Sequence, residues 1–346
     1  MTHVRWRATA RKTHDVGGKT RRSQCHYHQW PRDRCPSPVQ RGWTQCRLSS
    51  MLFVTVIVVG YRSASLICDL LMSINRQGAG WVGRVIVVDN ASGDCSLEAL
   101  EAMVVSLGMS SIVEVIDAGK NGGFGAGNNA GAAAAMRTGN PDVLWFLNPD
   151  TLVDGVHLEQ ALEWFEREPR VGIVGTGLDD GNGGHELAGH HDPTPLGEFV
   201  RNGGAFVMLR RYLLSDPRLD RPGPVEWVSG ASLMIRSSTF EQLGGFDESF
   251  FLYFEEVDLC RRARRSDWAV VYEPRVRVVH FEGQTTGTKN TKPHPRCWYE
   301  SRRRYFVKHF GKLGLLCADA AWLLGRAVAK VRLKDCDSCR WGELWQ

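Results

Sequence analysis

Carboxylates and one histidine at the ends of apolar segments are the residues of this sequence best suited to chemistry. Asp89 ends the run RVIVVD, Asp150 follows LWFL within Asn148-Pro-Asp150, and His280 ends the run VRVVH. A carboxylate in such a place can accept hydrogen bonds from a ligand or bind a hard divalent cation, and an imidazole can share that cation. The plainer alternatives are turn caps at the two aspartates and a merely hydrogen-bonded histidine.

A second acidic cluster, Glu255, Glu256 and Asp258, follows a run of aromatic residues. Three close carboxylates repel one another, which predicts a raised pKa for at least one of them, and such a carboxylate suits general-base chemistry. The alternative is a helix N-terminus, where the helix dipole favours acidic residues, with Arg261 and Arg262 as their partners.

A glycine- and asparagine-rich loop at 119–129 allows the backbone to approach a ligand closely and leads into a helix N-terminus, which favours anions. The loop lacks the G-x-G-x-x-G spacing of a dinucleotide site, and no G-x-x-x-x-G-K-[ST] P-loop occurs in the chain. A purely structural turn is the alternative.

The elements that must position these residues form an α/β pattern. The first strand, helix and second strand make a βαβ unit, which predicts a parallel sheet with ligands bound beyond the carboxyl ends of its strands. The segment 179–195 is predicted to be a loop over the surface. Strands are expected at 52–60, 84–89, 113–117, 143–148, 172–177, 225–235 and 269–280. Helices are expected at 65–77, 96–107, 156–167, 237–243, 256–266 and 313–331, and an alanine-rich helix is expected between the Gly-rich loop and Arg137.

The charge of the chain is uneven. Residues 1–50 hold 11 Lys and Arg but 2 Asp and Glu, which leaves 32 basic and 36 acidic residues for the rest. This leader is expected to be disordered, and a start assigned upstream of Met51 explains it better than a basic tail for nucleic acid or anionic lipid. With 43% hydrophobic residues, the remainder can bury a large core. We expect a folded domain at 51–310 and a C-terminal helix and tail at 311–346.

Ten cysteines are scattered along the chain, and only Cys336 and Cys339 have metal-ligand spacing, without a second pair. Most are expected to be reduced, buried thiols. The amphipathic segment 313–331 is expected to pack on the domain rather than lie on a membrane surface. The basic run Arg302–Arg304 could bind an acceptor diphosphate or an anionic lipid, or could simply be solvated.

Seven ordered motifs between Phe53 and Phe310 together resemble family 2 glycosyltransferases, particularly the bacterial rhamnosyltransferase-like branch. They are VTVIVVGYRSA, VVDNASGD, NGGFGAGNN, LNPD, WVSGASLMIR, GGFDESFFLYFEEVDLCRR and the final VVH. The resemblance implies a GT-A fold at 51–310, with a mostly parallel central sheet flanked by helices. It also implies a cytoplasmic enzyme, located at the inner face of the plasma membrane if it contacts lipid.

The resemblance implies an inverting transferase that moves a sugar, with rhamnose favoured, from a nucleotide-diphosphate donor. The acceptor would be a cell-wall, polysaccharide or polyprenyl-linked glycan, and no nucleic acid would be involved. The implied residues are Glu256 as general base; Asp150 and His280 as ligands of Mg²⁺ or Mn²⁺; Val59, Tyr61, Asp89, Asn121 and Asn148 at the nucleotide; and Trp227, Gly230, Glu255 and Asp258 at the sugar or acceptor pocket.

Two departures from the family pattern affect this assignment. Asn148 stands where the first aspartate of the family's Asp-x-Asp motif is expected, and Glu256 stands where the base is an aspartate. A degenerate nucleotide-sugar-binding protein therefore remains an alternative. A Rossmann-type oxidoreductase is a weaker one, because the dinucleotide motif does not follow the first strand.

Overall fold

The computed structural model describes residues 52–78, 80–186, 188–203, 221–281 and 294–334. Contacts divide the chain into two units, Met1–Arg47 and Leu48–Gln346, and every described residue lies in the second. The predictions made for the leader at 1–50 and for Cys336 and Cys339 lie outside the described residues.

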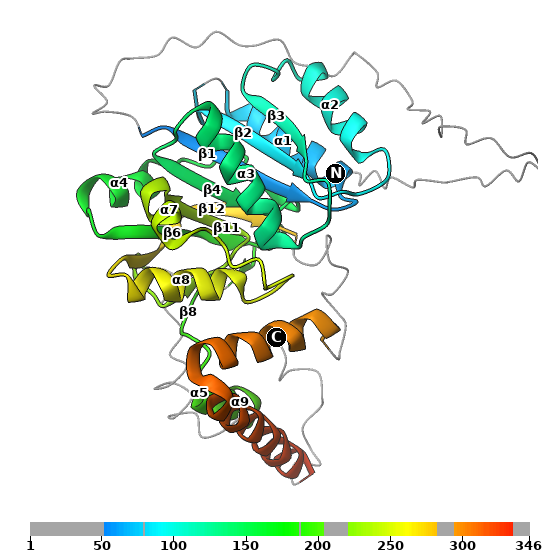
Figure 1. Cartoon of the computed structure of the whole chain (residues 1–346). Helices are drawn as coiled ribbons and strands as arrows, with labels where there is room; N and C mark the ends of the chain where they lie inside the picture. Colours follow the sequence, from blue (N-terminus) through cyan, green and yellow to red (C-terminus); the bar gives the residue numbers. More distant parts are fainter. Residues whose placement is uncertain (1–51, 79, 187, 204–220, 282–293, 335–346) are drawn as a thin grey trace, which may run out of the picture. The chain divides into compact units, whose positions relative to one another are not determined.

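A mixed ten-stranded sheet forms the centre of the second unit (Figure 1). Its main strand order is β3-β2-β1-β4-β11-β6-β12-β5, with β7 beside β6 and β9 beside β12. A second sheet pairs β8 (Gly189–His190) with β10 (Trp227–Val228). The strands of the main sheet are β1 (Val54–Gly60), β2 (Arg84–Asp89), β3 (Val113–Asp117), β4 (Val143–Leu147), β5 (Thr151–Leu152), β6 (Val171–Asp179), β7 (His185–Glu186), β9 (Gly223–Pro224), β11 (Ser232–Arg236) and β12 (Ala269–His280).

Most pairings of the long strands are parallel, as the sequence predicted. Strands β1, β2, β3 and β4 run parallel to one another, and β6 runs parallel to β12. The exception is β11, which lies antiparallel between β4 and β6. Its N-terminal end therefore meets the carboxyl end of β4, and the loop before β11 lies at the edge where ligands bind in such sheets.

Helices flank the sheet, and α3 lies close to it because of its glycines (Figure 1). A Cβ atom at Gly127 would lie 2.5 Å from Val59, and one at Gly131 would lie 2.6 Å from Ile57. The helices are α1 (Ala64–Gln77), α2 (Ser96–Ser106), α3 (Phe124–Thr138), α4 (Glu159–Arg167), α5 (Pro195–Gly203), α7 (Ser237–Leu243), α8 (Glu255–Arg265) and α9 (Arg296–Lys334).

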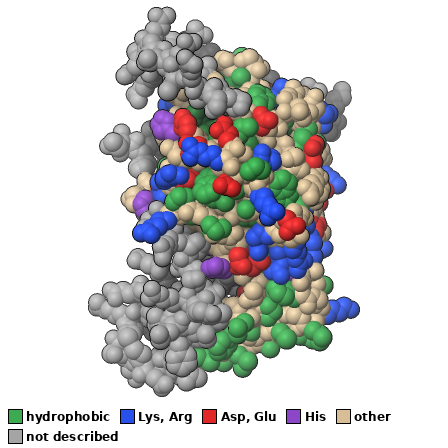
Figure 2. Space-filling view, turned by 90° about the vertical axis from the view of Figure 1, so that its left-hand side faces the viewer, with side chains coloured by type: hydrophobic (Ala, Val, Ile, Leu, Met, Phe, Trp, Pro, Cys, Tyr) green, Lys and Arg blue, Asp and Glu red, His purple; other side chains and the backbone are tan. Residues whose placement is uncertain are grey.

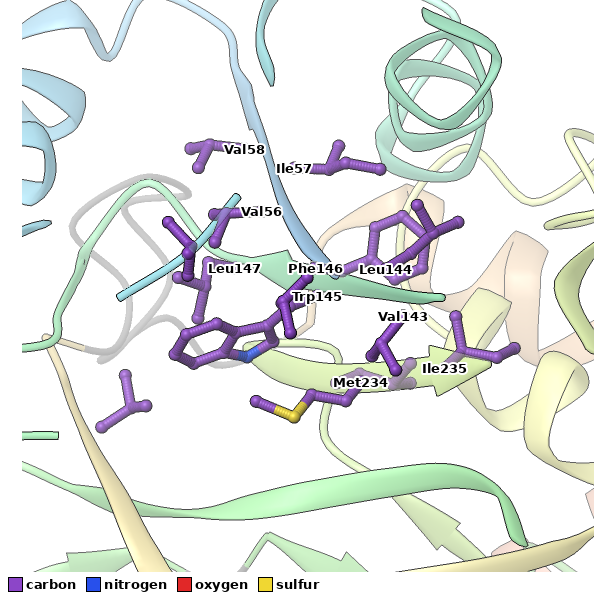
Figure 3. Close-up of a cluster of buried hydrophobic side chains, with 14 of the residues drawn as sticks. Val56, Ile57, Val58, Val143, Leu144, Trp145, Phe146, Leu147, Met234 and Ile235 are labelled. Atoms are coloured by element: carbon purple, nitrogen blue, oxygen red, sulfur yellow. The ribbon is translucent and has the colours of Figure 1, made fainter. Parts of the chain in front are cut away.

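The main core forms where the apolar strands lie side by side. Figure 3 shows side chains from β1, β4 and β11 gathered there, among them Trp145, Phe146 and Met234, and all three are fully buried. The indole N–H of Trp145 donates to the hydroxyl of Ser232 at 2.9 Å, so the largest side chain of this core has no unsatisfied polar group.

Three expected elements differ from the structure. The strand predicted over 225–235 is broken into β10 and β11, because β10 pairs with β8 in the second sheet while β11 pairs with β4 in the main sheet. The segment 179–195 contains the short strands β7 and β8 as well as loops. The glycine-rich loop ends earlier than its composition suggests, since α3 begins at Phe124.

The C-terminal helix also differs from the prediction. Helix α9 begins at Arg296 and is kinked at Gly311, which has a φ of 71°. Its buried residues beyond the kink include Leu315 and Ala318, which join a second core with Phe250, Phe254, Val257, Tyr305 and Phe306. The expectation that the leucine-rich face of 313–331 packs on the domain is wrong: Leu313, Leu316, Leu323 and Leu324 are exposed. Within the described ranges, no helix is both long and apolar enough to cross a membrane.

Candidate active site

The pairing of β5 with β12 brings Asp150 and His280 together. His280 lies opposite Thr151 in the register, and the backbone N–H of Phe281 donates to the carbonyl oxygen of Asp150 at 2.9 Å. The His280 Nε2 atom is 3.5 Å from Asp150 Oδ1 and 3.5 Å from the Asn148 amide nitrogen. Both Asp150 and His280 are buried. Two residues that are 130 positions apart in the sequence thus form one polar site beside the carboxyl end of β4.

Glu186 holds the other side of the His280 ring. Its carboxylate lies 3.0 Å from His280 Nδ1, which it approaches from β7. Burial alone lowers the pKa of His280, but the Asp150 and Glu186 carboxylates outweigh burial and raise the pKa to about 9. The two carboxylates therefore orient the ring with its Nε2 atom toward Asp150.

This arrangement fits a divalent cation. A carboxylate oxygen and an imidazole nitrogen are both accepted by Mg²⁺- and Mn²⁺-type sites, and a ligating histidine usually has a carboxylate on its second ring nitrogen. Asp150 and His280 supply the two direct groups, and Glu186 supplies the supporting one. Among the described residues, no group of three or more His, Cys, Asp or Glu side chains could by itself hold a metal ion.

Glu255 and Glu256 begin α8 directly after two strained residues. Tyr253 and Phe254 both have a φ of 69°, a left-handed conformation that costs bulky residues about 1–3 kcal/mol each. Such strain persists where the surrounding structure holds the backbone in place, as the second core holds Phe254 here. The two glutamates are therefore set at a defined point of the helix N-terminus.

Burial sets the protonation of the two glutamates. It raises the pKa of Glu256 to about 7, and burial together with the charge of Glu256 raises the pKa of Glu255 well above its ordinary range. Glu255 is buried and Glu256 is half-buried. Within the described part of the chain, the Glu256 Oε2 atom has no hydrogen-bond partner. A carboxylate of this kind can take a proton near neutral pH.

Short contacts connect the Asp150 site to Glu256. The backbone N–H of Asn148 donates to the carbonyl oxygen of Ala231 at 3.0 Å. At the neighbouring Gly230, a Cβ atom would lie 3.5 Å from the Cβ of Glu256. The loop before β11 thus lies between the Asp150 and His280 pair on one side and Glu256 on the other, and contacts both through Gly230 and Ala231.

Asp258 serves a different purpose from its two neighbours. It is fully buried and contacts three basic groups: Arg262 at 2.7 Å, Lys308 at 2.6 Å and His309 at 2.8 Å. Burial alone would raise its pKa, but these partners lower it to about 2. Asp258 therefore ties α8 to α9. Of the two arginines expected to partner the acidic cluster, only Arg262 contacts it, since Arg261 pairs with Asp192 at 2.9 Å.

The residues assigned to the nucleotide lie at the carboxyl ends of β1, β2 and β4, where Asn148 follows β4, and in the loop before α3. Asp89 is buried, and its carboxylate accepts hydrogen bonds from the backbone N–H and the hydroxyl of Ser92, as a turn cap does. Tyr61 is 41% exposed just beyond β1. Val59 has its side chain against Gly127 in the core.

The Gly-rich loop is held by amide side chains and by the segment before α8. Asn121 accepts from the Asn90 side chain and from the backbone N–H of Gly123, both at 3.1 Å. Gly123 has a φ of 89°, and a Cβ atom there would lie 2.0 Å from the Phe251 carbonyl oxygen. This position requires glycine, because a side chain would push the loop away from the acidic cluster.

Trp227 lies in the small second sheet and packs against both cores. Its indole N–H donates to the carbonyl oxygen of His191 at 2.9 Å, and its ring stacks on His190 with centroids 4.0 Å apart. The aromatic surface is half-buried. It is suited to packing against a sugar ring.

Sequence reasoning missed Glu186 and the buried pair of Glu198 with Arg302. The Arg302 Nε atom is 2.8 Å from Glu198, and its Nη1 atom is 2.6 Å from Asp319, so Arg302 does not belong to a solvated basic run. Each of these residues is placed by a partner far away in the sequence. No local pattern could have identified them.

Comparison with known proteins identifies the family of the chain. A family model described as "Glycosyltransferase like family 2" matches residues 52–301. The chain is 30% identical over 219 residues to the N-acetylglucosaminyl-diphospho-decaprenol L-rhamnosyltransferase of Mycobacterium tuberculosis, with 59% of this chain and 68% of the relative covered. It is 24% identical to the rhamnosyltransferase WbbL of Escherichia coli, with 66% of this chain and 83% of the relative covered.

Solved structures show the same fold. GalNAc-T7, crystallised with UDP, GalNAc and Mn²⁺, is 11% identical with a TM-score of 0.54, over 83% of this chain and 58% of that one. TarS of S. aureus is 16% identical with a TM-score of 0.50, over 84% of this chain and 44% of that one. With the mixed sheet and flanking helices described above, the fold is of the GT-A type. The chain belongs to glycosyltransferase family 2 and is a glycosyltransferase that uses a nucleotide-sugar donor.

Proposed function

We propose that this enzyme transfers rhamnose, with inversion, from a nucleotide-diphosphate donor to a polyprenyl-linked or cell-wall glycan. The donor and acceptor are those suggested by the names of its relatives in M. tuberculosis and E. coli. The supporting observation within the chain is that Asn148 and Gly230 connect the Asp150 and His280 pair to Glu256.

Asp150 and His280 would hold Mg²⁺ or Mn²⁺, with Glu186 keeping the imidazole in place. When bound, the cation would neutralise charge on the departing nucleoside diphosphate. The imidazole must be neutral to act as a ligand, so cation binding would displace the proton that the two carboxylates otherwise favour. Asn148 would serve as a neutral neighbour of this pair rather than as a second carboxylate.

Glu256 would act as the general base toward the acceptor hydroxyl. Its Oε2 atom has no partner among the described residues, and its raised pKa of about 7 matches proton uptake at neutral pH. Glu255 would lie beside it, with a pKa that burial and the charge of Glu256 raise well above its ordinary range. The glutamate reaches one methylene further than the family's aspartate, which places the acceptor hydroxyl correspondingly further from α8.

The nucleotide would lie across the carboxyl ends of β1 and β2. Asp89 and Asn121 would bind the base there, beside the backbone of Val59 and the exposed ring of Tyr61. Trp227 and Gly230 would line the sugar and acceptor pocket. Asp258 would position α8 rather than contact the sugar or acceptor, because its carboxylate is already paired with three basic groups.

A panel of nucleotide sugars tests the donor, with and without Mn²⁺ and with EDTA as control. We expect one donor to raise the melting temperature in the presence of metal and to be hydrolysed slowly without acceptor. dTDP-rhamnose is the expected donor. Turnover of a different sugar would overturn the rhamnose assignment but not the transferase one. Metal-independent turnover would overturn the assignment of Asp150 and His280.

A further inference from the structure

Helix α9 has two apolar faces beyond its kink at Gly311. In the part of the chain that the structure describes, one face is buried and the other is exposed. The covered face carries Leu315, Ala318 and Gly325, which are buried. The other face is a stripe at spacings of three and four residues, and every member is exposed. We call it the leucine stripe; its residues are Leu313, Leu316, Cys317, Ala320, Leu323, Leu324 and Ala327.

The leucine stripe is larger than a chance exposure of apolar residues. Leu313 is 77% exposed, and Leu316, Leu323 and Leu324 are each close to 60%. Spacings of three and four place all seven residues on one side of a helix over about four turns. Figure 2 shows hydrophobic side chains gathered at the lower end of the molecule, where Figure 1 places α5 and α9. A contiguous apolar surface of this kind marks an interaction site.

The charge of α9 indicates what covers the stripe. Residues 296–334 contain 10 Lys and Arg and 2 acidic residues. Two of the basic residues are already paired with the domain: Arg302 with Glu198, and Lys308 with Asp247 and Asp258. The two acids are already paired, Glu300 with Arg296 and Asp319 with Arg302. Lys312 and Arg326 are exposed along the flank of the stripe, and Arg303 and Arg304 are exposed before the kink. The helix therefore presents an apolar stripe beside a basic flank.

A second copy of the chain fits this surface poorly. A symmetric dimer would place α9 against itself, so that two basic flanks face each other with few carboxylates between them. An anionic bilayer fits better, because its acyl region accepts the leucines while its headgroups attract the arginines and lysines.

We infer that the leucine stripe of α9 docks the enzyme on an anionic lipid surface. The helix connects this surface to the acidic cluster: Trp298 stacks edge-on against Phe254, and the Ser301 hydroxyl donates to the Leu252 carbonyl oxygen at 2.8 Å. Trp298 lies roughly 20 Å along the helix from the kink at Gly311, after which the leucine stripe begins. This inference deepens the proposed function, since a lipid-linked acceptor would then reach Glu256 from the same membrane.

Vesicle binding by the full chain tests the inference without any sugar transfer. The protein is sedimented with vesicles of phosphatidylcholine alone and of phosphatidylcholine with phosphatidylglycerol, at low and high salt. We expect binding to the anionic vesicles that is weakened but not abolished by salt. In the double variant Leu316→Gln/Leu323→Gln, the partition coefficient should fall about tenfold for each leucine. In Lys312→Gln/Arg326→Gln, it should fall about fivefold for each charge.

The matched control is Val105→Gln, which removes a similarly exposed apolar side chain on α2 and should bind vesicles as the parent does. All the substituted residues are exposed, so the melting temperature should not change. The inference would be overturned if the leucine substitutions left vesicle binding unchanged, or if high salt abolished binding completely. Either result would mean that electrostatic attraction alone holds the protein on the vesicles. A parent dimer that becomes monomeric in the leucine variant would overturn the inference in favour of self-association. Hydrolysis of the donor in solution tests the proposed function separately.

Discussion

The backbone N–H of Phe124 donates to the carbonyl oxygen of Phe251 at 2.9 Å, which joins the Gly-rich loop to the segment that leads into α8. Residues 121–123 approach the nucleotide side of the site, and Glu255 and Glu256 follow Phe251 by only a few residues. One hydrogen bond thus connects the two halves of the site, and it forms only because Gly123 leaves room for it.

Replacing Gly123 by alanine should disturb both halves at once. The left-handed backbone alone costs about 1–3 kcal/mol, and the added Cβ would overlap the Phe251 carbonyl oxygen. Gly119→Ala is the matched control, since Gly119 has a φ of 71° but open space around it. We expect a lower melting temperature in both variants and a loss of donor turnover only in Gly123→Ala. Equal turnover in the two variants would contradict the prediction.

Glu256→Gln should remove the general base while keeping the shape of the side chain. General-base catalysis contributes about 10²–10⁴-fold, so kcat for transfer should fall by that factor with little change in the KM of the donor. Glu241→Gln, an exposed residue of α7, is the control and should leave kcat unchanged. Full activity in Glu256→Gln would exclude it as the base.

The pH profile follows from the raised pKa of Glu256. A base must be deprotonated to act, and burial sets its pKa at about 7, so kcat/KM should rise with pH and level off above that value. The measurement is kcat/KM for transfer over a pH series at saturating metal. The acidic limb should disappear from the residual activity of Glu256→Gln. An acidic limb centred near the ordinary glutamate value of 4.5 would show that burial does not act as described.

Glu186→Gln should weaken the binding of Mn²⁺ without removing a direct ligand. The carboxylate lies 3.0 Å from His280 Nδ1. Loss of such a supporting group typically lowers metal affinity about 10- to 100-fold, so we expect the affinity for Mn²⁺ to fall about tenfold or more. Titration of Mn²⁺ against the protein measures this directly. Glu166→Gln, on the exposed surface of α4, is the control. Unchanged Mn²⁺ affinity in Glu186→Gln would indicate that His280 is not a ligand of the metal.

Asp258→Asn should destabilise the fold, because it leaves three basic groups without their buried carboxylate. Breaking a buried ion pair from one side costs about 3–5 kcal/mol, measured as the free energy of unfolding. The folded pKa of Asp258 is lowered from 3.8 to about 2, so its stabilisation is complete above 3.8 and is lost as the pH falls through about 2. The parent should therefore lose stability in acid over this window, and Asp258→Asn should not show that part of the loss.

Local patterns were sufficient for most of the fold. The β-branched runs predicted β1 and β2 with at most two residues of error, because a strand buried on both faces needs apolar residues throughout. The bounds of β3 and β12 were also predicted correctly, although both strands contain charged residues. The strand ends then indicated where Asp89, Asp150 and His280 would lie, since parallel strands expose their carboxyl ends at one edge. The order of the motifs was enough to indicate the family, which the family comparison confirms.

Other features depended on contacts that no local pattern contains. The leucines of residues 313–331 have helical spacing whether they face the core or the solvent, and only the packing of Leu315 and Ala318 shows which face is covered. Glu186 reaches His280 because β7 pairs with β6 next to β12. Asp258 has the same local pattern as Glu256, yet α9 supplies it with Lys308 and His309 and leaves Glu256 without them. The sequence by itself determined which residue types stand at the strand ends, because that depends on local hydrophobicity; the tertiary structure decided which of them meet, because charge and burial depend on neighbours that are distant in the chain.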